Sequence, residues 1–526
     1  MTAEAQQTAP QPTPGDSEAP DRREIRAVIL GLMIVLGLAA IDQSIVATAL
    51  PRIVSDLGGV THLSWVVSAY VLASTSTMPL YGKLSDQYGR KPMIYAAILI
   101  FLLGSILSGM AQTLLQLILF RAIQGIGAGG LLPLAQIIIG DLVPPARRGR
   151  NQGSIAAVFA VCSVIGPIAG GVITDLLSWH WIFYVNLPIG AVALIMIGRA
   201  LKRPHQVRNR RIDYLGAVLL TACTTSFLLT LALGGNEWAW NSPQSLGLAA
   251  AALVLGILFV FHIRHEPEPV LPPALFRSRL FVIACLVLAL TFMGMLGATL
   301  FFPLFFQMVM GVTPSHSGFL TGPLMIGFVI SSMLNGRVLL QRSGRYKPAQ
   351  LCGLGLATTA FATLAWAIAT SQGFVIIEPP IFALGLGLGL VMPTMTVAVQ
   401  NALPLAHRGV GTATLAFFRS LGGLIGVTGS GAILAYRVQK VAGSSGGLDM
   451  SSLTEGGLKQ LATASPEAHA AAIALYRHAI AMTFATGTVI VALALIALLF
   501  LPEIPLKTTH DEDMKPPPGG AGRIRS

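Results

Sequence analysis

Apolar residues occur along this chain in blocks of about 20, separated by short stretches that hold most of the charged residues. A helix needs about 20 apolar residues to cross the hydrocarbon core of a bilayer. The pattern therefore predicts an all-α, polytopic membrane protein. It has fourteen predicted spans, over residues 27–50, 63–81, 93–111, 114–140, 152–175, 181–201, 213–233, 244–263, 280–306, 316–336, 348–370, 374–398, 410–435 and 478–501.

Composition excludes several classes of soluble protein. Of the 526 residues, 54% are hydrophobic and 11% are charged, whereas a soluble domain has about 25% charged residues. The longest stretch between predicted spans, 437–476, is too short for a folded catalytic or ATPase domain, which needs about 100–150 residues. No G-x-x-x-x-G-K-[ST] phosphate loop occurs, because the pair Gly82-Lys83 is followed by Leu84. We therefore expect no nucleotide as a partner.

Basic residues predict the topology. With both termini inside, 27 Lys and Arg fall on the cytoplasmic side and only five fall outside. This asymmetry is the positive-inside pattern, so the net charge of +12 indicates membrane orientation and not nucleic-acid binding. Residues 1–26 and 502–526 are predicted to be disordered cytoplasmic tails. The four cysteines lie far apart in apolar blocks, which favours packing over a disulfide or metal site.

An internal repeat predicts the architecture. Residues 125–149 align with 385–409 at a constant offset of 260, with eight identities in 25 positions. The loop after the second span is echoed after the tenth. These matches predict two six-helix halves, 27–201 and 280–501, with two inserted helices within 202–279 and an external loop at 437–476. Transporters with two repeated halves bind their substrate near the midplane, between the halves.

Several motifs follow one another in the order and on the membrane sides that the topology predicts. They are Ile41–Pro51 around Asp42, Gly82–Pro92, Arg121–Gly125, Gly166–Gly171, Trp179–Gly190 and Gly234–Trp238. With these motifs the chain resembles the major facilitator superfamily, specifically its fourteen-span drug:proton antiporters. It departs from the family pattern in two places: the second copy of the loop motif lacks an acid equivalent to Asp86, and His180 stands where the family usually has Arg.

Charged and polar residues inside predicted spans are candidates for proton coupling, because intramembrane charge is energetically costly. Asp42 lies in the outer half of the first span. Arg121 lies in the outer half of the fourth, where the repeat has Ile381, so the fold itself does not need an Arg there. The resemblance implies that such an Arg controls deprotonation of the coupling acid. Gln124 could share this polar patch, and Glu378 is either a second proton site or a side chain that extends to the outer surface.

The resemblance also implies an inner gate and an antiporter motif. The gate would involve Gly82, Asp86, Gly89, Arg90 and Asp141, with the charged residues forming a relay of ion pairs at the cytoplasmic ends of the helices. The antiporter motif comprises Gly166, Pro167, Gly170 and Gly171. Helix packing alone is the alternative reading for each glycine.

A weaker set of candidates suggests a substrate cavity. It comprises Phe292, Met295, Phe305, Gln307 and Arg419. Aromatic and Met side chains suit adaptable binding of lipophilic compounds, but ordinary packing explains most of them equally well. Arg419 corresponds to Phe159 in the repeat, and it either faces the cavity or bonds to a backbone carbonyl.

The sequence thus predicts a secondary active multidrug transporter that exchanges protons for amphipathic or lipophilic compounds. The alternative is a dedicated proton-coupled exporter of one endogenous metabolite, lipid or antibiotic. An integral membrane enzyme is disfavoured, because the ten histidines are scattered and form no metal or nucleophile pattern. We expect a monomer in a bacterial plasma membrane, with lipid and a small substrate as its partners, a proton gradient as its energy source, and no cofactor or metal.

Overall fold

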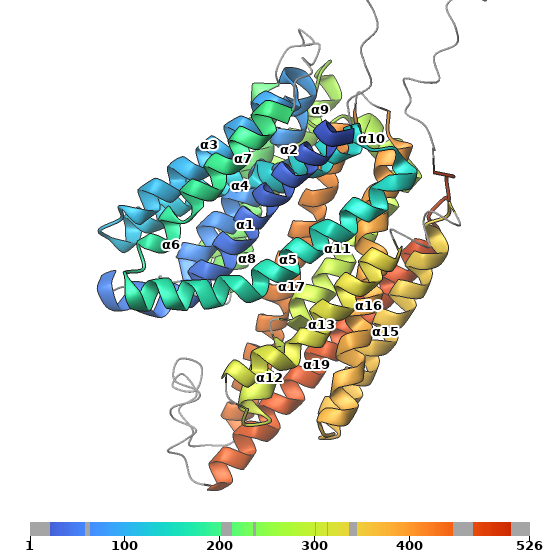
Figure 1. The fold of residues 1–526 in the computed structure, drawn as a ribbon. Coiled ribbons are helices and arrows are strands. Elements are labelled where there is room, and N and C mark those ends of the chain that lie inside the picture. The colour runs from blue at the N-terminus through green and yellow to red at the C-terminus, as the bar shows by residue number, and fades with distance from the viewer. Residues whose placement is uncertain are drawn as a thin grey trace, which may run out of the picture.

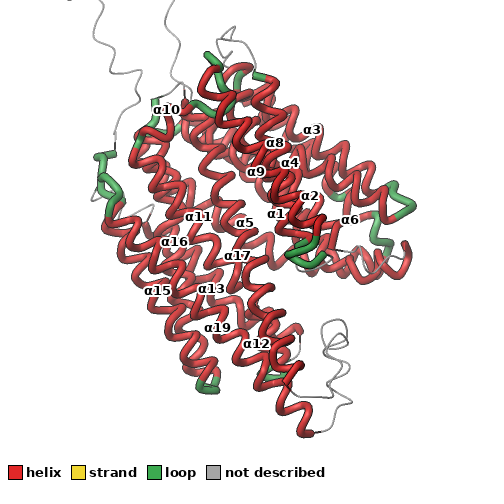
Figure 2. Tube along the Cα trace, turned by 180° about the vertical axis from the view of Figure 1, so that it is seen from behind, coloured by secondary structure: helices red, strands yellow, loops and turns green. Residues whose placement is uncertain are grey.

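The computed structural model describes residues 22–57, 64–200, 213–234, 238–299, 301–312, 314–335, 344–404, 407–444 and 466–506. Within these ranges the chain forms helices joined by short loops and contains no β-strand (Figure 2). Thirteen of these helical segments are long and apolar enough to cross a membrane. The helix at 64–88 matches the remaining predicted span, and the run of hydroxyl residues at 74–77 makes it less apolar. Every predicted span therefore falls on a helix.

The N-terminal half forms one helical bundle. Its helices are α1 (Arg22–Leu57), α2 (Ser64–Tyr88), α3 (Arg90–Gly109), α4 (Leu114–Leu142), α5 (Pro145–Leu176), α6 (Trp181–Tyr184) and α7 (Asn186–Ala200). Thr113 caps the start of α4, because its side chain accepts a hydrogen bond from Gln116 N. A core of buried apolar side chains that includes Leu36, Ile98 and Leu134 holds these helices together.

The C-terminal half forms a second bundle with its own core, which includes Phe281, Phe361 and Phe484. Its helices are α11 (Arg279–Thr299), α12 (Phe301–Met308), α13 (Pro314–Leu334), α15 (Lys347–Ala369), α16 (Phe374–Ala402), α17 (Arg408–Ser444) and α19 (Pro466–Leu499). Figure 1 shows the two bundles converging near α10 (Pro273–Arg277) and diverging toward α6 and α12.

The inserted helices lie against both halves. They are α8 (Tyr214–Leu233) and α9 (Pro243–His265). Ser76 of α2 and Thr225 of α8 are hydrogen-bonded at 3.1 Å, whereas Phe259 and Ile263 of α9 belong to the core of the C-terminal half. The insertion is therefore packed at the junction of the two halves.

The repeated glycines have the same structural role in both halves. On α4, Gly125 and Gly129 face the backbone of α2, and Gly127 between them faces the backbone of α3. On α16, Gly385 and Gly389 face α13, and Gly387 faces α15. A Cβ at any of these positions would overlap the neighbouring helix. The alternation places α4 and α16 each between two closely packed helices.

Some predicted boundaries are wrong. The first helix begins at Arg22, inside the predicted tail 1–26, and the helices that flank the external loop run to Ser444 and start at Pro466. Residues 502–506 of the predicted C-terminal tail pack on the C-terminal half. There Asn401 donates a hydrogen bond to Pro505 O, at 3.1 Å. Residues 1–21, 445–465 and 507–526, which include the rest of both tails and of the loop, lie outside the described residues.

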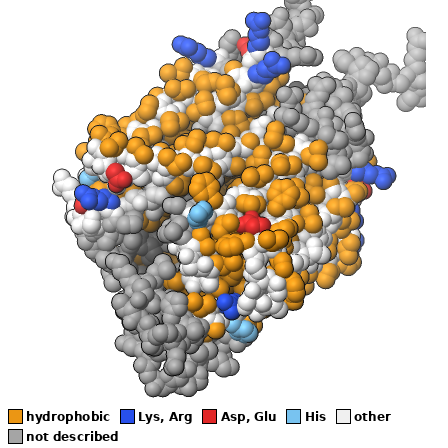
Figure 3. Space-filling model, turned by 60° about the horizontal axis from the view of Figure 1, so that its bottom comes forward, with side chains coloured by type: hydrophobic (Ala, Val, Ile, Leu, Met, Phe, Trp, Pro, Cys, Tyr) orange, Lys and Arg blue, Asp and Glu red, His pale blue; other side chains and the backbone are white. Residues whose placement is uncertain are grey.

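The outer surface of the helices suits a lipid environment. Large apolar side chains such as Val164, Phe261 and Val375 are 62%, 66% and 86% exposed. Figure 3 shows a face that is mostly hydrophobic, with few charged side chains. Burying such a surface in lipid removes it from water, so the fold is that of a multi-pass membrane protein.

Candidate proton-coupling site and inner gate

A buried polar network surrounds Asp42 in the N-terminal half. Arg121 Nη1 lies 2.7 Å from Asp42 Oδ2, and Gln124 Nε2 donates to Asp42 Oδ1, also at 2.7 Å. Arg121 Nη1 also donates to Gln124 Oε1, at 2.8 Å. All three side chains are at most 1% exposed. The structure thus brings together the three residues that sequence analysis grouped in one polar patch.

Three further helices complete the network. Asn186, at the start of α7, donates to Asp42 Oδ1 and to Ser105 Oγ of α3, each at 2.8 Å. On the other side, Arg121 Cζ lies 4.2 Å from the ring centre of Tyr70 on α2, within range of a cation–π contact. Asp42 therefore accepts three hydrogen bonds from three donors, on α4 and α7.

This arrangement matches the ionised form of Asp42. A carboxylate accepts several hydrogen bonds and balances the guanidinium charge. If Asp42 took up a proton, the Arg121 charge would stay buried without its counter-charge, which is energetically costly.

A second polar cluster joins α2, α3 and α4 at the ends that the charge pattern predicts to be cytoplasmic. Arg90 Nη1 lies 2.6 Å from Asp86 Oδ1 and 2.8 Å from Ser85 Oγ, and Arg90 Nε lies 2.8 Å from Asp141 Oδ2. Arg90 thus bridges two carboxylates, as the resemblance implied. Gly89 has a φ of 98°, a value that favours glycine, and this turn directs Arg90 back over α2.

Asp86 also connects the two halves. Its Oδ2 accepts a hydrogen bond from Val410 N, in the first turn of α17, at 2.9 Å, where the positive end of the helix dipole favours an anion. Burial raises the pKa of Asp86, against the opposing effects of Arg90 and of the Val410 N–H. Next to it, a Cβ at Gly82 would lie 2.5 Å from Ala413 Cβ, so α2 and α17 touch at this end.

Further contacts between the halves lie at the same end. A Cβ at Gly153 of α5 would lie 3.0 Å from Met333 Cα of α13. Gln400 of α16 donates to Gln136 O of α4, at 3.1 Å. The structure is therefore closed at the end that the charge pattern predicts to be cytoplasmic. Of the second copy of the loop motif, residues 336–348, positions 336–343 lie outside the described residues.

The predicted antiporter motif packs α5 against α1. Gly166 faces Ser44, and Gly170 faces Thr48 and the Ile45 carbonyl, whereas Gly171 has free space around it. Ser44 Oγ also donates to Cys162 O, at 3.2 Å. Pro167 lies inside α5 without interrupting it. Two of the three glycines thus permit close contact near the helix that holds Asp42.

Glu378 is separate from the Asp42 network. It lies near the start of α16, which packs on α13 and α15. Its buried Oε1 atom has no hydrogen-bond partner among the described residues. It remains a candidate acid, but it shares no contact with Asp42 or Arg121.

The predicted cavity residues fall into two groups within the C-terminal half. Arg419 Cζ lies 5.1 Å from the ring centre of Phe292, and no hydrogen bond or ion pair joins Arg419 to another described residue. Met295 packs against the core next to them. Near the outer end, Phe305 is buried in α12 and Gln307 Nε2 donates to Ser317 Oγ, at 3.0 Å. Among the described residues, Arg419 thus bonds to no backbone carbonyl.

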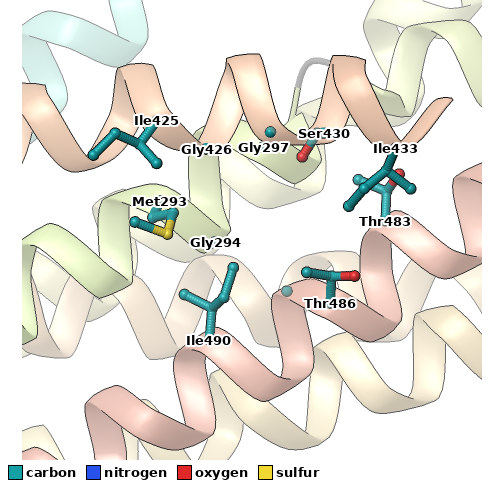
Figure 4. A pocket seen from close by; sticks show the side chains of 12 residues that line it. Met293, Gly294, Gly297, Ile425, Gly426, Ser430, Ile433, Thr483, Thr486 and Ile490 are labelled. Atoms are coloured by element: carbon teal, nitrogen blue, oxygen red, sulfur yellow. The ribbon is translucent and has the colours of Figure 1, made fainter. Parts of the chain in front are cut away.

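A small cavity of about 120 Å³ lies between α11, α17 and α19. Figure 4 shows Met293, Ile425 and Ile490 around it, with the hydroxyls of Ser430, Thr483 and Thr486 toward one end. Phe305 lines a second cavity, of about 150 Å³, together with Gln372 and Arg477. Neither cavity is lined by Phe292 or Arg419.

The comparison with family models decides the family. Residues 32–427 match the model described as Major Facilitator Superfamily. The chain belongs to the major facilitator superfamily. It is therefore a multi-pass membrane transporter, and both the superfamily and the fold point to transport and not to catalysis.

Two relatives and one solved structure illustrate the likeness. The chain is 39% identical over 410 residues to Multidrug transporter protein MdtP of Bacillus subtilis, covering 78% of this chain and 75% of that protein. It is 32% identical over 509 residues to MFS-type efflux transporter ffsH of Aspergillus flavipes, covering 92% and 85%. The crystal structure of the human organic anion transporter MFSD10 shares the major facilitator fold, with a TM-score of 0.62, 14% identity, and coverage of 90% of this chain and 99% of that chain.

Sequence reasoning missed Asn186, Ser105 and Tyr70 in this major facilitator site. A signal for Asn186 was present, since it is a polar residue inside the predicted span 181–201. In the structure Asn186 begins α7, directly after Val185, and its side chain donates to Asp42. Ser105 and Tyr70 occur in spans with other hydroxyl residues and carried no distinguishing signal.

Proposed function

We propose that this transporter exports amphipathic or lipophilic compounds in exchange for protons. The observation that supports this proposal best is the buried Asp42–Arg121 pair, with its amide donors Gln124 and Asn186. A buried acid whose ionised form is stabilised by one set of partners can bind a proton in one conformation and release it in another. The relatives named as a multidrug transporter and as an efflux transporter support the export direction.

The contacts at the inner gate suggest how exchange would proceed. In the present arrangement two contacts close the cytoplasmic end: the hydrogen bond from Val410 N to Asp86, and the close packing of Gly82 against α17. In our proposal a proton from outside binds Asp42 in this state and weakens its pair with Arg121. The resulting change favours opening of the cytoplasmic end, where the proton leaves and substrate enters.

The other parts of the proposal follow from charge and composition. We propose a plasma-membrane protein of a bacterium, with both termini cytoplasmic, that acts as a monomer in the bilayer. Its energy source is the proton gradient, with no cofactor and no nucleotide. Its partners are the bilayer and a small lipophilic substrate, and nucleic acid is not among them. Phe292 and Arg419 are the side chains that we propose contact substrate in the C-terminal half.

Efflux measurements test the proposal. Cells that overexpress the chain are loaded with a fluorescent amphipathic compound, and its efflux is followed with and without a protonophore while ATP is maintained. We expect efflux to stop when the proton gradient is dissipated, and to be absent in Asp42→Asn. The matched control is Asp175→Asn, which removes an exposed acid at the end of α5 and should leave efflux unchanged. Uphill efflux that persists without a proton gradient would contradict proton exchange.

A further inference from the structure

Three side chains that can bind metal ions lie together where the inserted helices meet the cytoplasmic end. They are Asp213, which precedes α8, and His262 and Glu266 at the end of α9. The atoms that could act as ligands all lie within 4.8 Å of one another. This cluster is separate from the Asp42 network and from the ion pairs of Arg90.

The backbone fixes the cluster in place. Asp213 caps α8, since its Oδ1 accepts a hydrogen bond from Gly216 N at 2.7 Å, and its Oδ2 accepts one from Val270 N at 3.2 Å. Each carboxylate oxygen has two lone pairs, so Asp213 can keep both bonds and still bind a cation. His262 and Glu266 are four residues apart, a spacing that places two side chains on one face of a helix.

The cluster combines two carboxylates, of Asp213 and Glu266, with the imidazole of His262. His262 Nε2 lies 2.7 Å from Asp213 Oδ1, so the imidazole nitrogen already points at the carboxylate. The Glu266 carboxylate makes no hydrogen bond or ion pair with another described residue, although it lies in the same cluster. Asp213 is 5% exposed. Two carboxylates and one imidazole together offer the oxygen and nitrogen atoms that bind a divalent cation.

We propose that Asp213, His262 and Glu266 form a binding site for one divalent transition-metal ion, of which Zn²⁺ is the best fit. Imidazole nitrogen and carboxylate oxygen atoms both bind Zn²⁺, with bonds of about 2.0–2.2 Å. Bonds of that length place the ligand atoms about 3–3.5 Å apart, so the existing cluster needs only small side-chain movements. The Gly216 and Val270 N–H groups then hydrogen-bond to the Asp213 carboxylate and orient it, without binding the metal ion themselves.

The site is connected to the inner gate by a short segment of chain. Glu268, two residues after Glu266, lies 3.3 Å from Lys83 Nζ of α2, and Lys83 is next to Gly82. Val270 in the same segment is held by Asp213. A metal ion would therefore join α8, α9 and this segment into one rigid unit beside α2.

Metal titration of the purified full-length protein tests the proposal. After treatment with a chelator, Zn²⁺ is titrated in a calorimeter, and the unfolding temperature is measured with and without Zn²⁺. We expect one equivalent to bind and to raise the unfolding temperature. In His262→Ala and in Glu266→Gln the affinity for Zn²⁺ should fall at least about tenfold, and Zn²⁺ should raise the unfolding temperature less.

The controls separate this site from adventitious binding. His265→Ala removes an exposed histidine on the same helix, whose Nδ1 bonds to Phe261 O, and it should bind Zn²⁺ as the unmodified protein does. Glu266→Gln keeps the helix end intact, so it serves even if His262→Ala fails to fold. The proposal is overturned if no stoichiometric binding occurs, if Glu266→Gln binds normally, or if His265→Ala loses binding to the same extent.

Discussion

Arg121 Nη1 lies 2.7 Å from Asp42 Oδ2, although 79 residues separate the two positions along the chain. Both side chains are fully enclosed by protein, in a half whose core is built from apolar side chains. Removing one member of a buried ion pair leaves the other uncompensated, at a cost of about 3–5 kcal/mol. The two residues should therefore behave as a unit.

We expect Arg121→Ala to lower the free energy of unfolding and to abolish proton-driven export, because Asp42 loses its counter-charge. The Asp42→Asn/Arg121→Ala double variant should lose less unfolding free energy than the sum of the two single losses, since either change alone already removes the interaction. Chemical unfolding and efflux are measured for the unmodified protein, the two single variants and the double variant, which together form a double-mutant cycle. Additive losses would show that the two residues act independently.

Asn186→Ala should change the pH profile of export, because Asn186 is a direct donor to Asp42. The loss of a buried hydrogen bond should also cost about 1–3 kcal/mol of stability. Asn335→Ala is the matched control, since Asn335 is equally buried and donates to Leu390 O in the C-terminal half. We expect a similar loss of stability but no change in the pH profile. If both variants alter the profile alike, Asn186 has only a structural role.

At the inner gate, Asp86→Ala or Arg90→Ala should lower the export rate more than the substrate affinity. These residues bias a conformational equilibrium and do not line the space proposed for substrate. Rates and binding constants measured on the same preparations distinguish the two effects. A variant with normal conformational exchange but no substrate binding would show that the gate assignment is wrong.

The pKa of Asp86 gives the gate a pH dependence with a definite sign. Burial in the closed gate raises this pKa, so closing the gate favours the protonated form. The closed gate should be most stable below the ordinary pKa of an aspartate, and this advantage should be lost as pH rises through the raised pKa. Spin labels on the cytoplasmic ends of α2 and α17 would report the distance between them against pH. In Asp86→Asn the distance should not follow pH through this group, and an unchanged dependence would exclude Asp86 as its source.

The sequence was sufficient for the architecture because the relevant signals are local or periodic. Apolar blocks locate the helices, and the glycines at 125–129 and 385–389 reveal the repeat, since close helix contacts need the same small residues in both halves. Asp42 and Arg121 could be paired because both are charges in the outer half of their spans. The same reasoning makes Glu378 a candidate for proton coupling, but it gives no indication that this residue lies apart from Asp42 and Arg121.

Other features depend on three-dimensional contacts that leave no trace in spacing. The bond from Val410 N to Asp86 joins positions 324 residues apart, and a backbone donor has no sequence signature. Asn186 reaches Asp42 because α7 packs on α1, and the hydropathy of 181–201 gives no sign of this contact. The packing of residues 502–506 likewise depends on Asn401 and Tyr346 of the C-terminal half.

In the proposed mechanism, Asp42 is the group that exchanges a proton against substrate. Proton release on addition of substrate can be measured directly, with a pH-sensitive dye, on purified protein in weakly buffered detergent solution. We predict release from the unmodified protein and none from Asp42→Asn, in which the amide keeps the shape of the side chain but has no proton to exchange, while substrate still binds. Undiminished release from Asp42→Asn would contradict the account and would identify another acid, with Glu378 the first to examine, as the proton carrier.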